Sequence, residues 1–186
     1  MQGNGLSIMV SSAVYGSESD LDQIKSILIG FGYDVIMSKD GNINIRIDET
    51  PEEACLRAVE ECDLFFGVLF PRYGSGVAHK EFNRAIELNK PMWFVAHGFI
   101  KYTKNLMHQF MYDGGDRNDF DIQSTTVLDS LKVIDMYNDV PSDKWIQSFS
   151  RTSEIQLFIE TQFKDISKIS KQLEARSDHD TAALVE

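Results

Sequence analysis

The sequence lacks a hydrophobic run long enough to cross a membrane, and it has few residues that form disulfides or bind metals. No stretch of about 18 apolar residues occurs, so we expect no membrane span. Residues 1–5 have neither the positive charge nor the apolar run of a secretion signal. The two cysteines, Cys55 and Cys62, would lie about 10 Å apart along one helix, too far for a disulfide. These features predict a cytoplasmic protein with reduced thiols, and no histidine is clustered with the cysteines as a metal site would require.

Basic residues are also scarce. The 186 residues include 18 Lys and Arg against 29 Asp and Glu, which gives a net charge of −11. A nucleic-acid surface needs a basic face, so we expect no nucleic-acid partner. The length and an apolar share of 42% predict one domain with an ordinary core, with room for an appendage.

The stretch between Cys62 and Ala96 has the pattern of two strands joined by a helix. Its parts are a strand, a glycine-containing turn, a helix and a second strand: Leu64–Phe70, Pro71–Gly76, Val77–Asn89 and Met92–Ala96. Such a unit predicts parallel strands with a right-handed crossover. Ligands of parallel sheets bind at the carboxyl ends of the strands, where the turn and Glu81 would lie.

Two more strands and two more helices precede this unit. The expected elements alternate as strand and helix: Leu6–Ser12, Glu18–Gly30, Tyr33–Ser38 and Pro51–Glu61. Thr50 begins the second helix as a capping residue, with Pro51 next and Glu53 three positions later. The polar residues 39–50 fit either a short edge strand or a lobe over the pocket mouth. The alternation predicts an α/β protein with an open parallel sheet and helices on both faces.

The second half shows no strand pattern. We expect helices at about 102–111, 124–137 and 153–175, and a polar loop at 112–123. The apolar stripe of 153–175 would pack on its own domain or on a partner. The predicted organisation is therefore an α/β domain (1–99), a helical extension (100–176) and a disordered tail (177–186).

Several motifs occur in the order that a known family has them. They are Ser11-Ser12 at a strand end, Cys62-Asp63-Leu64 at a strand start, the turn Tyr73-Gly74-Ser75 and Glu81 at the opening of a helix. Over residues 6–97 the chain resembles the bacterial TIR-like domains grouped as a domain of unknown function. It is more distantly similar to NAD-cleaving TIR domains and to nucleoside deoxyribosyltransferases. The resemblance implies a flavodoxin-like or TIR-like three-layer fold, here with a C-terminal helical extension.

The resemblance also implies a reaction at an N-glycosidic bond. The bond between nicotinamide and ribose would be cleaved in NAD, which would be a substrate and not a cofactor. Both related families use a glutamate at the position of Glu81, where a carboxylate could stabilise an oxocarbenium-like transition state or attack directly. Loss of NAD or an ADP-ribose-type signal would then serve antiphage defence. The implied partners are NAD or a related nucleotide, further copies of the chain in a homo-oligomer, and a downstream effector protein.

Further residues would line the same crevice. The turn could offer backbone N–H groups to a phosphate, an arginine could pair with one, and an aromatic ring could stack on a base. The predicted substrate-binding residues are Ser11, Ser12, Tyr15, Phe70, Arg72, Tyr73, Gly74, Ser75 and His97.

Each of these residues also has a purely structural interpretation. Glu81 could be a first-turn acid paired with Arg84, and the serines could satisfy backbone groups at the end of a strand. Two other functions also fit the pattern. The first is a nucleoside or nucleotide N-glycosyl hydrolase or transferase, which would ignore NAD. The second is a non-catalytic TIR-like interaction module, in which Glu81→Gln would leave biological activity intact.

Overall fold

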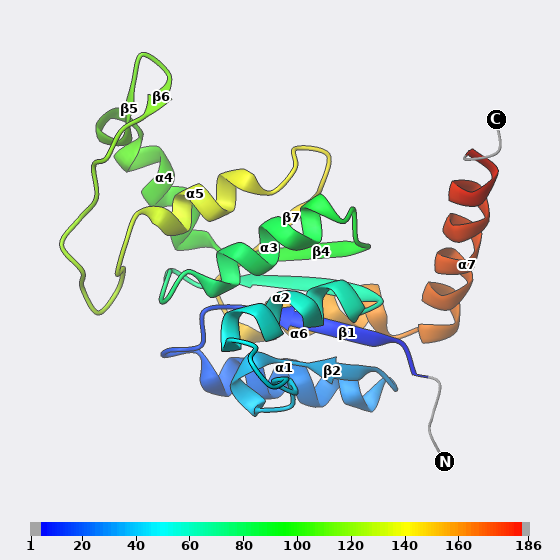
Figure 1. The fold of residues 1–186 in the computed structure, drawn as a ribbon. Coiled ribbons are helices and arrows are strands. Elements are labelled where there is room, and N and C mark those ends of the chain that lie inside the picture. The colour runs from blue at the N-terminus through cyan, green and yellow to red at the C-terminus, as the bar shows by residue number, and fades with distance from the viewer. Residues whose placement is uncertain (1–4, 184–186) are drawn as a thin grey trace.

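The uncharged strands of the N-terminal half form the middle of one parallel sheet. The computed structural model describes residues 5–183. Five strands pair in the order β2-β1-β3-β4-β7, and all neighbours are parallel (Figure 1). Their bounds are Ser7–Ser11 (β1), Asp34–Ile36 (β2), Leu64–Leu69 (β3), Met92–His97 (β4) and Ile146–Phe149 (β7). This is the strand order of flavodoxin-like folds, so the predicted fold class is confirmed.

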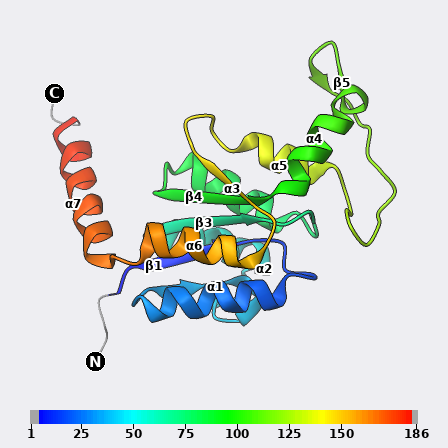
Figure 2. The ribbon, with the colours of Figure 1, turned by 180° about the vertical axis from the view of Figure 1, so that it is seen from behind.

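Helices cover both faces of the sheet, as a three-layer arrangement requires. In Figure 2, α1 (Glu18–Gly30) and α6 (Thr152–Phe163) lie side by side on one face. The opposite face carries α2 (Pro51–Glu61) and α3 (Val77–Glu87). The remaining helices are α4 (Gly98–Met111), α5 (Lys132–Asp139) and α7 (Ile166–Ala183), with a short 3₁₀ turn at Ser38–Asp40. No described helix combines the length and the apolar character needed to cross a membrane.

Alternate side chains of β3 face the two halves of the core. Phe65 and Leu69 pack with α2 and α3, whereas Phe66 and Val68 pack with α1 and α6. Gly67 allows α3 to approach closely, because a Cβ there would lie 2.5 Å from Cζ of Phe82. The neighbour of Phe82 is Glu81, so this close packing also positions the candidate catalytic residue.

The predicted start of α2 is confirmed in detail. Thr50 Oγ1 accepts a hydrogen bond from the Glu53 N–H at 3.2 Å, and Glu53 Oε2 accepts one from the Thr50 N–H at 2.8 Å. This reciprocal pair satisfies two backbone donors that a helix start leaves open. Cys55 and Cys62 are free and buried, as expected.

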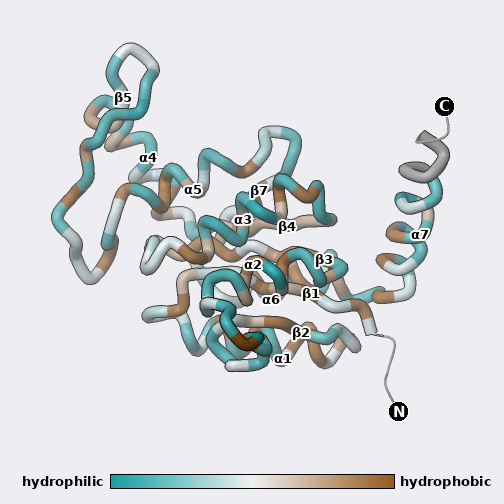
Figure 3. The backbone as a smooth tube through the Cα atoms, in the orientation of Figure 1, coloured by the Kyte–Doolittle hydropathy of each residue, from teal (hydrophilic) through white to brown (hydrophobic). Residues whose placement is uncertain are grey.

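The prediction that no strand follows residue 100 was wrong. β7 pairs with β4 and extends the sheet, while β5 (Tyr112–Asp113) and β6 (Asp116–Arg117) form a small hairpin at the end of α4. β7 has only four residues and lies at the sheet edge, so it lacks the continuous apolar run that marked the inner strands. Figure 3 shows that the hairpin is largely hydrophilic.

Other boundaries in the second half also differ from the predictions. The helix expected at 124–137 is present only in its second part, as α5 (Lys132–Asp139), and residues 124–131 are not helical. The single helix expected at 153–175 is divided into α6 and α7 near Asp165, where the chain turns away from the sheet (Figure 1). The predicted disordered tail, 177–186, is helical as far as Ala183, and its last three residues lie outside the described part. Residues 39–50 form no strand.

Candidate functional site

A pocket of about 350 Å³ lies where the strand order reverses, at the carboxyl ends of β1 and β3. From β1 the sheet extends to β2 on one side and to β3 and β4 on the other, and loops that leave in opposite directions open a crevice between them. The pocket is lined by Ser12, Ala13, Val14, Tyr15, Ser38, Arg72, Tyr73, Gly74, Ser75, Val77, Ala78, Glu81 and Asp129. The predicted position of the site therefore coincides with a real cavity.

Glu81 reaches the floor of this pocket from the second turn of α3. It is only 2% exposed, and Ser11, the last residue of β1, donates a hydrogen bond from Oγ to Glu81 Oε2. The other oxygen, Oε1, is buried and makes no hydrogen bond of ordinary geometry with any described residue. A buried carboxyl group with one oxygen hydrogen-bonded and the other buried without a hydrogen bond is costly for a folded protein, which is typical of functional sites.

Burial raises the pKa of Glu81 from 4.5 to about 7. The hydrogen bond from Ser11 opposes this rise in pKa, and the thiol of Cys55 opposes it to a smaller extent. The carboxyl group therefore changes its charge near neutral pH, where a catalytic carboxylate is most useful.

The structural interpretation of Glu81 as an ion-pair partner of Arg84 was wrong. Arg84 instead pairs with Glu60 at 2.6 Å and with Glu87 at 3.1 Å. Because Glu81 points inward and Arg84 points outward on α3, the spacing of three residues did not bring them together.

The turn between β3 and α3 has the geometry that its glycines predict. Gly74 and Gly76 have positive φ angles of 62° and 81°. The backbone N–H groups of Tyr73 and Gly74 both donate to the carboxylate of Asp129, at 2.8 and 2.9 Å. Asp129 was not among the predicted site residues, because residues 124–137 were expected to form a helix and its partners are more than 50 residues away.

Arg72 is also held by that loop. Its guanidinium donates to the carbonyl oxygen of Thr125 at 3.3 Å and to that of Thr126, and it lies 5.5 Å from the ring centroid of Tyr15. Of the groups predicted to bind phosphate, Arg72 and the N–H groups of Gly74 and Gly76 are therefore engaged within the chain.

Most predicted substrate-binding residues meet at the pocket. Ser12, Tyr15, Arg72, Tyr73, Gly74 and Ser75 line it, and Ser11 contacts it through Glu81. Tyr15 is 75% exposed and available at the mouth, whereas the hydroxyl of Tyr73 shares a 3.1 Å hydrogen bond with Nδ1 of His79.

Phe70 and His97 lie elsewhere. Phe70 is buried on the α1 and α6 side of the sheet, with its ring edge-on to Phe149 at 5.5 Å. His97 Nδ1 accepts a hydrogen bond from the Phe99 N–H at 3.2 Å, which caps the start of α4. Neither residue lines the pocket that contains Glu81.

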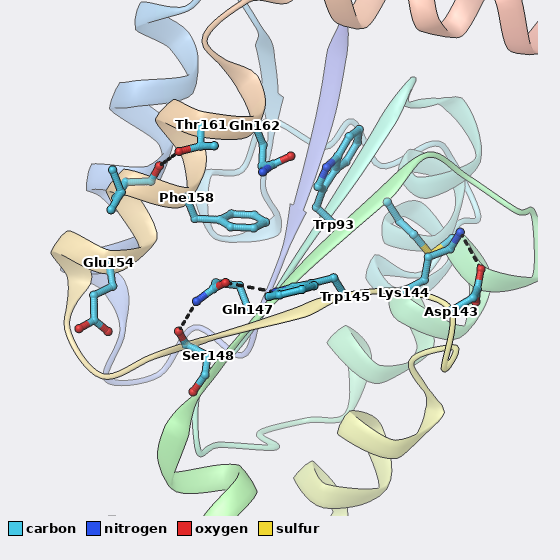
Figure 4. Close-up of a pocket in the computed structure, with 12 residues that line it drawn as sticks. Trp93, Asp143, Lys144, Trp145, Gln147, Ser148, Glu154, Phe158, Thr161 and Gln162 are labelled. Atoms are coloured by element: carbon cyan, nitrogen blue, oxygen red, sulfur yellow. Dashed lines mark hydrogen bonds and ion pairs between the residues drawn. The ribbon is translucent and has the colours of Figure 1, made fainter.

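A larger pocket of about 700 Å³ opens over β4, β7 and α6 (Figure 4). Trp93, Trp145 and Phe158 form its aromatic walls. Its acids are ordinary paired surface groups: Asp143 lies 3.2 Å from Lys144, and Glu154 lies 3.4 Å from Arg151. It lacks a buried titratable group comparable to Glu81, so the smaller pocket is the better candidate for chemistry.

The described residues offer no evident set of ligands for a metal ion. Among the side chains that the structure describes, residues 5–178, no three or more His, Cys, Asp or Glu residues are grouped so that they could hold a metal ion.

The model of one protein family, described as Domain of unknown function (DUF4062), matches residues 7–175. The chain belongs to this family. The DUF4062 match extends through β7 and α6, and so includes both the predicted α/β domain and most of the predicted extension. No curated protein matches the chain.

A solved structure similar to this DUF4062 chain is described as "2-desoxiribosyltransferase from Leishmania mexicana". The two share 16% sequence identity and a TM-score of 0.44, over 71% of this chain and 95% of the other. Similarity at this level says nothing about activity.

Proposed function

We propose that this protein cleaves the N-glycosidic bond of nucleosides, with Glu81 as the catalytic carboxylate. The observation that carries the proposal is the burial of Glu81 at the floor of the pocket, with Oε2 held by Ser11 and Oε1 without a partner. Because Ser11 holds Oε2, we assign the reaction with substrate to Oε1, which is buried and would be reached from the pocket that Glu81 lines.

The reaction requires one nucleophile and one leaving group. The C1′–N bond breaks with its electron pair leaving on the base, which takes up a proton from solvent, while Glu81 Oε1 forms an ester bond to C1′. Water then attacks C1′ and gives up one proton to solvent, the C1′–Oε1 bond breaks, and the sugar leaves with a new hydroxyl group while the carboxylate is returned. A second base in place of water would give transfer instead of hydrolysis. Ser11 would fix the carboxylate through both steps.

The volume of the pocket and an aromatic ring at its mouth favour a nucleoside. Its volume of about 350 Å³ lies near the lower end of the range for ligand pockets, which suits one sugar and one base. The exposed ring of Tyr15 at the mouth offers a surface on which a base can stack.

NAD is the second candidate substrate. The motifs at Ser11-Ser12, Tyr73-Gly74-Ser75 and Glu81 resemble those of TIR-like domains, which favours the bond between nicotinamide and ribose. Only the nicotinamide riboside part would then occupy the pocket, with the remainder outside it. This candidate includes the proposals made from the resemblance: NAD loss or an ADP-ribose-type signal, antiphage defence, a homo-oligomer and an effector partner.

The test is incubation of the wild type and Glu81→Gln with ribonucleosides, deoxynucleosides and NAD, with products separated by chromatography and identified by mass. Glutamine keeps the shape and the acceptor for Ser11 but cannot attack, so base release should fall by about 100-fold or more. The wild-type rate should rise as pH increases through about 7, because the carboxylate is the reactive form. Glu87→Gln, an exposed change on the same helix, is the matched control.

The products separate the alternatives. Nicotinamide release from NAD without base release from nucleosides would favour the second candidate. If assembled wild-type protein releases no base and Glu81→Gln retains biological activity, the chain is a non-catalytic interaction module and the proposal is wrong.

A further inference from the structure

Asp129, which lines the pocket, makes an unusual contact with the turn between β3 and α3. Both of its carboxylate oxygens accept hydrogen bonds from consecutive backbone N–H groups, Tyr73 to Oδ1 at 2.8 Å and Gly74 to Oδ2 at 2.9 Å. Consecutive N–H groups in a turn with a left-handed residue form a concavity that binds anions, and Gly74 has that conformation. A side chain of the protein therefore occupies the position that a phosphate oxygen would take.

The loop that carries Asp129 is anchored independently of this contact. Leu128 and Leu131 are buried in the core that includes α3, and Thr125 Oγ1 accepts hydrogen bonds from the Val127 and Leu128 N–H groups at 3.3 and 3.1 Å. Arg72 adds its hydrogen bonds to the carbonyl oxygens of the same loop. Asp129 is thus held against the turn by the fold.

The charges around the pocket also disfavour a bound phosphate. Its lining includes two acids, Glu81 and Asp129, and one base, Arg72, whose guanidinium is already engaged. Lys132 lies 6.0 Å from the ring centroid of Tyr73 and is not part of the lining. A phosphate would have to displace Asp129 and would meet uncompensated negative charge.

We infer that Asp129 fills the anion position of this pocket, so that the pocket selects substrates whose sugar carries a free hydroxyl at the turn and excludes phosphorylated ones. The inference rests on the proposed function and narrows it to unphosphorylated nucleosides. A carboxylate that accepts one N–H bond on each oxygen retains lone pairs that can accept a hydrogen bond from a sugar hydroxyl. Asp129 is therefore a specificity-determining residue.

The first test measures anion binding and does not require turnover. Inorganic phosphate is titrated at constant ionic strength into the wild type, Asp129→Asn and Asp129→Ser, and the amide resonances of Tyr73 and Gly74 are followed by NMR. In the wild type these resonances should not move saturably. At least one variant should bind phosphate at both amides, about tenfold or more tightly than the wild type.

Asp119→Asn is the matched control, because it removes the charge of an exposed acid that does not line the pocket. It should behave like the wild type. Saturable shifts of the two amides in the wild type would overturn the inference even if both variants at Asp129 fail to fold. Folded variants that gain no phosphate binding would overturn it as well.

The second test measures selectivity. The ratio of kcat/KM for a nucleoside to that for its 5′-monophosphate should be large in the wild type and fall by about tenfold or more in Asp129→Asn. If the protein turns over neither substrate, the proposed function fails, whereas the phosphate titration still decides whether Asp129 fills the anion position. A ratio unchanged by the substitution would refute the role of Asp129 in selectivity.

Discussion

Replacing Glu81 by glutamine should raise the free energy of unfolding, measured against the wild type, more at pH 8 than at pH 5. Burial raises the pKa of Glu81 from 4.5 to about 7, so between these values the unfolded chain releases a proton that the folded protein retains. The free energy of unfolding must therefore fall as pH rises through this window, by about 1.4 kcal/mol for each pH unit. Over the whole window the loss is about 3 kcal/mol, and glutamine, which does not ionise, avoids it.

The quantity to compare is the change in the free energy of unfolding between pH 5 and pH 8. Glutamine places an amide where Oε1 is now buried without a partner, which can cost about 1–3 kcal/mol at every pH. This offset cancels when the change in stability between pH 5 and pH 8 is compared for the two proteins. Glu81→Gln should gain about 2–3 kcal/mol on the wild type between these pH values, equivalent to roughly 4–12 °C in Tm.

The measurement is urea denaturation of both proteins at pH 5 and pH 8, followed by tryptophan fluorescence and by circular dichroism. Glu49→Gln is the control, because Arg57 lowers the pKa of Glu49 to about 2. The stability that Glu49 contributes is present above its unfolded pKa and is lost only at acid pH, so this variant should differ from the wild type equally at pH 5 and pH 8. The reasoning is refuted if Glu81→Gln also shows the same difference from the wild type at both pH values.

Three further changes have expected outcomes. Ser11→Ala removes a hydrogen bond that favours the carboxylate, so the pKa of Glu81 should rise further and the pH–rate profile should move to higher pH; an unmoved profile in steady-state kinetics would contradict this role. Gly67→Ala should cost about 1–3 kcal/mol in urea denaturation because its Cβ would overlap aromatic rings, whereas Gly30→Ala, in open space, should be neutral or stabilising; equal effects would count against the packing argument. Thr50→Ala should lose about 1 kcal/mol of unfolding free energy and Thr50→Ser much less, and equal losses would show that the cap hydrogen bond is unimportant.

The sequence allowed good prediction of the parts whose signal is local. The uncharged run of β3, the glycine turn and the helix with Glu81 follow one another without interruption, so the unit and its topology could be inferred from periodicity and turn chemistry. The cap at Thr50 could be predicted for the same reason, because all of its hydrogen-bonding groups lie within four residues.

Contacts between segments far apart in the sequence could not be predicted from local patterns. Asp129 lies in a segment that the apolar spacing predicted to be helical, and nothing in its neighbours indicates the turn that it contacts. β7 is short and at an edge, and only Ile146 and Phe149 are apolar. Phe70 is different, because the alternation of Phe66, Val68 and Phe70 on one face could have indicated that it points away from Glu81.

The long excursion between β4 and β7 affects how the chain can fold. β4 ends at His97, and its neighbour β7 begins only at Ile146, after α4, the hairpin and α5. During synthesis from the amino terminus, one edge of β4 must stay unpaired until the excursion is complete, and the aromatic face of the sheet must wait for α6. An exposed apolar strand edge is prone to intermolecular pairing, so the nascent chain passes through a stage at which it is vulnerable to aggregation. A polypeptide that ends at residue 99 would remain at that stage permanently.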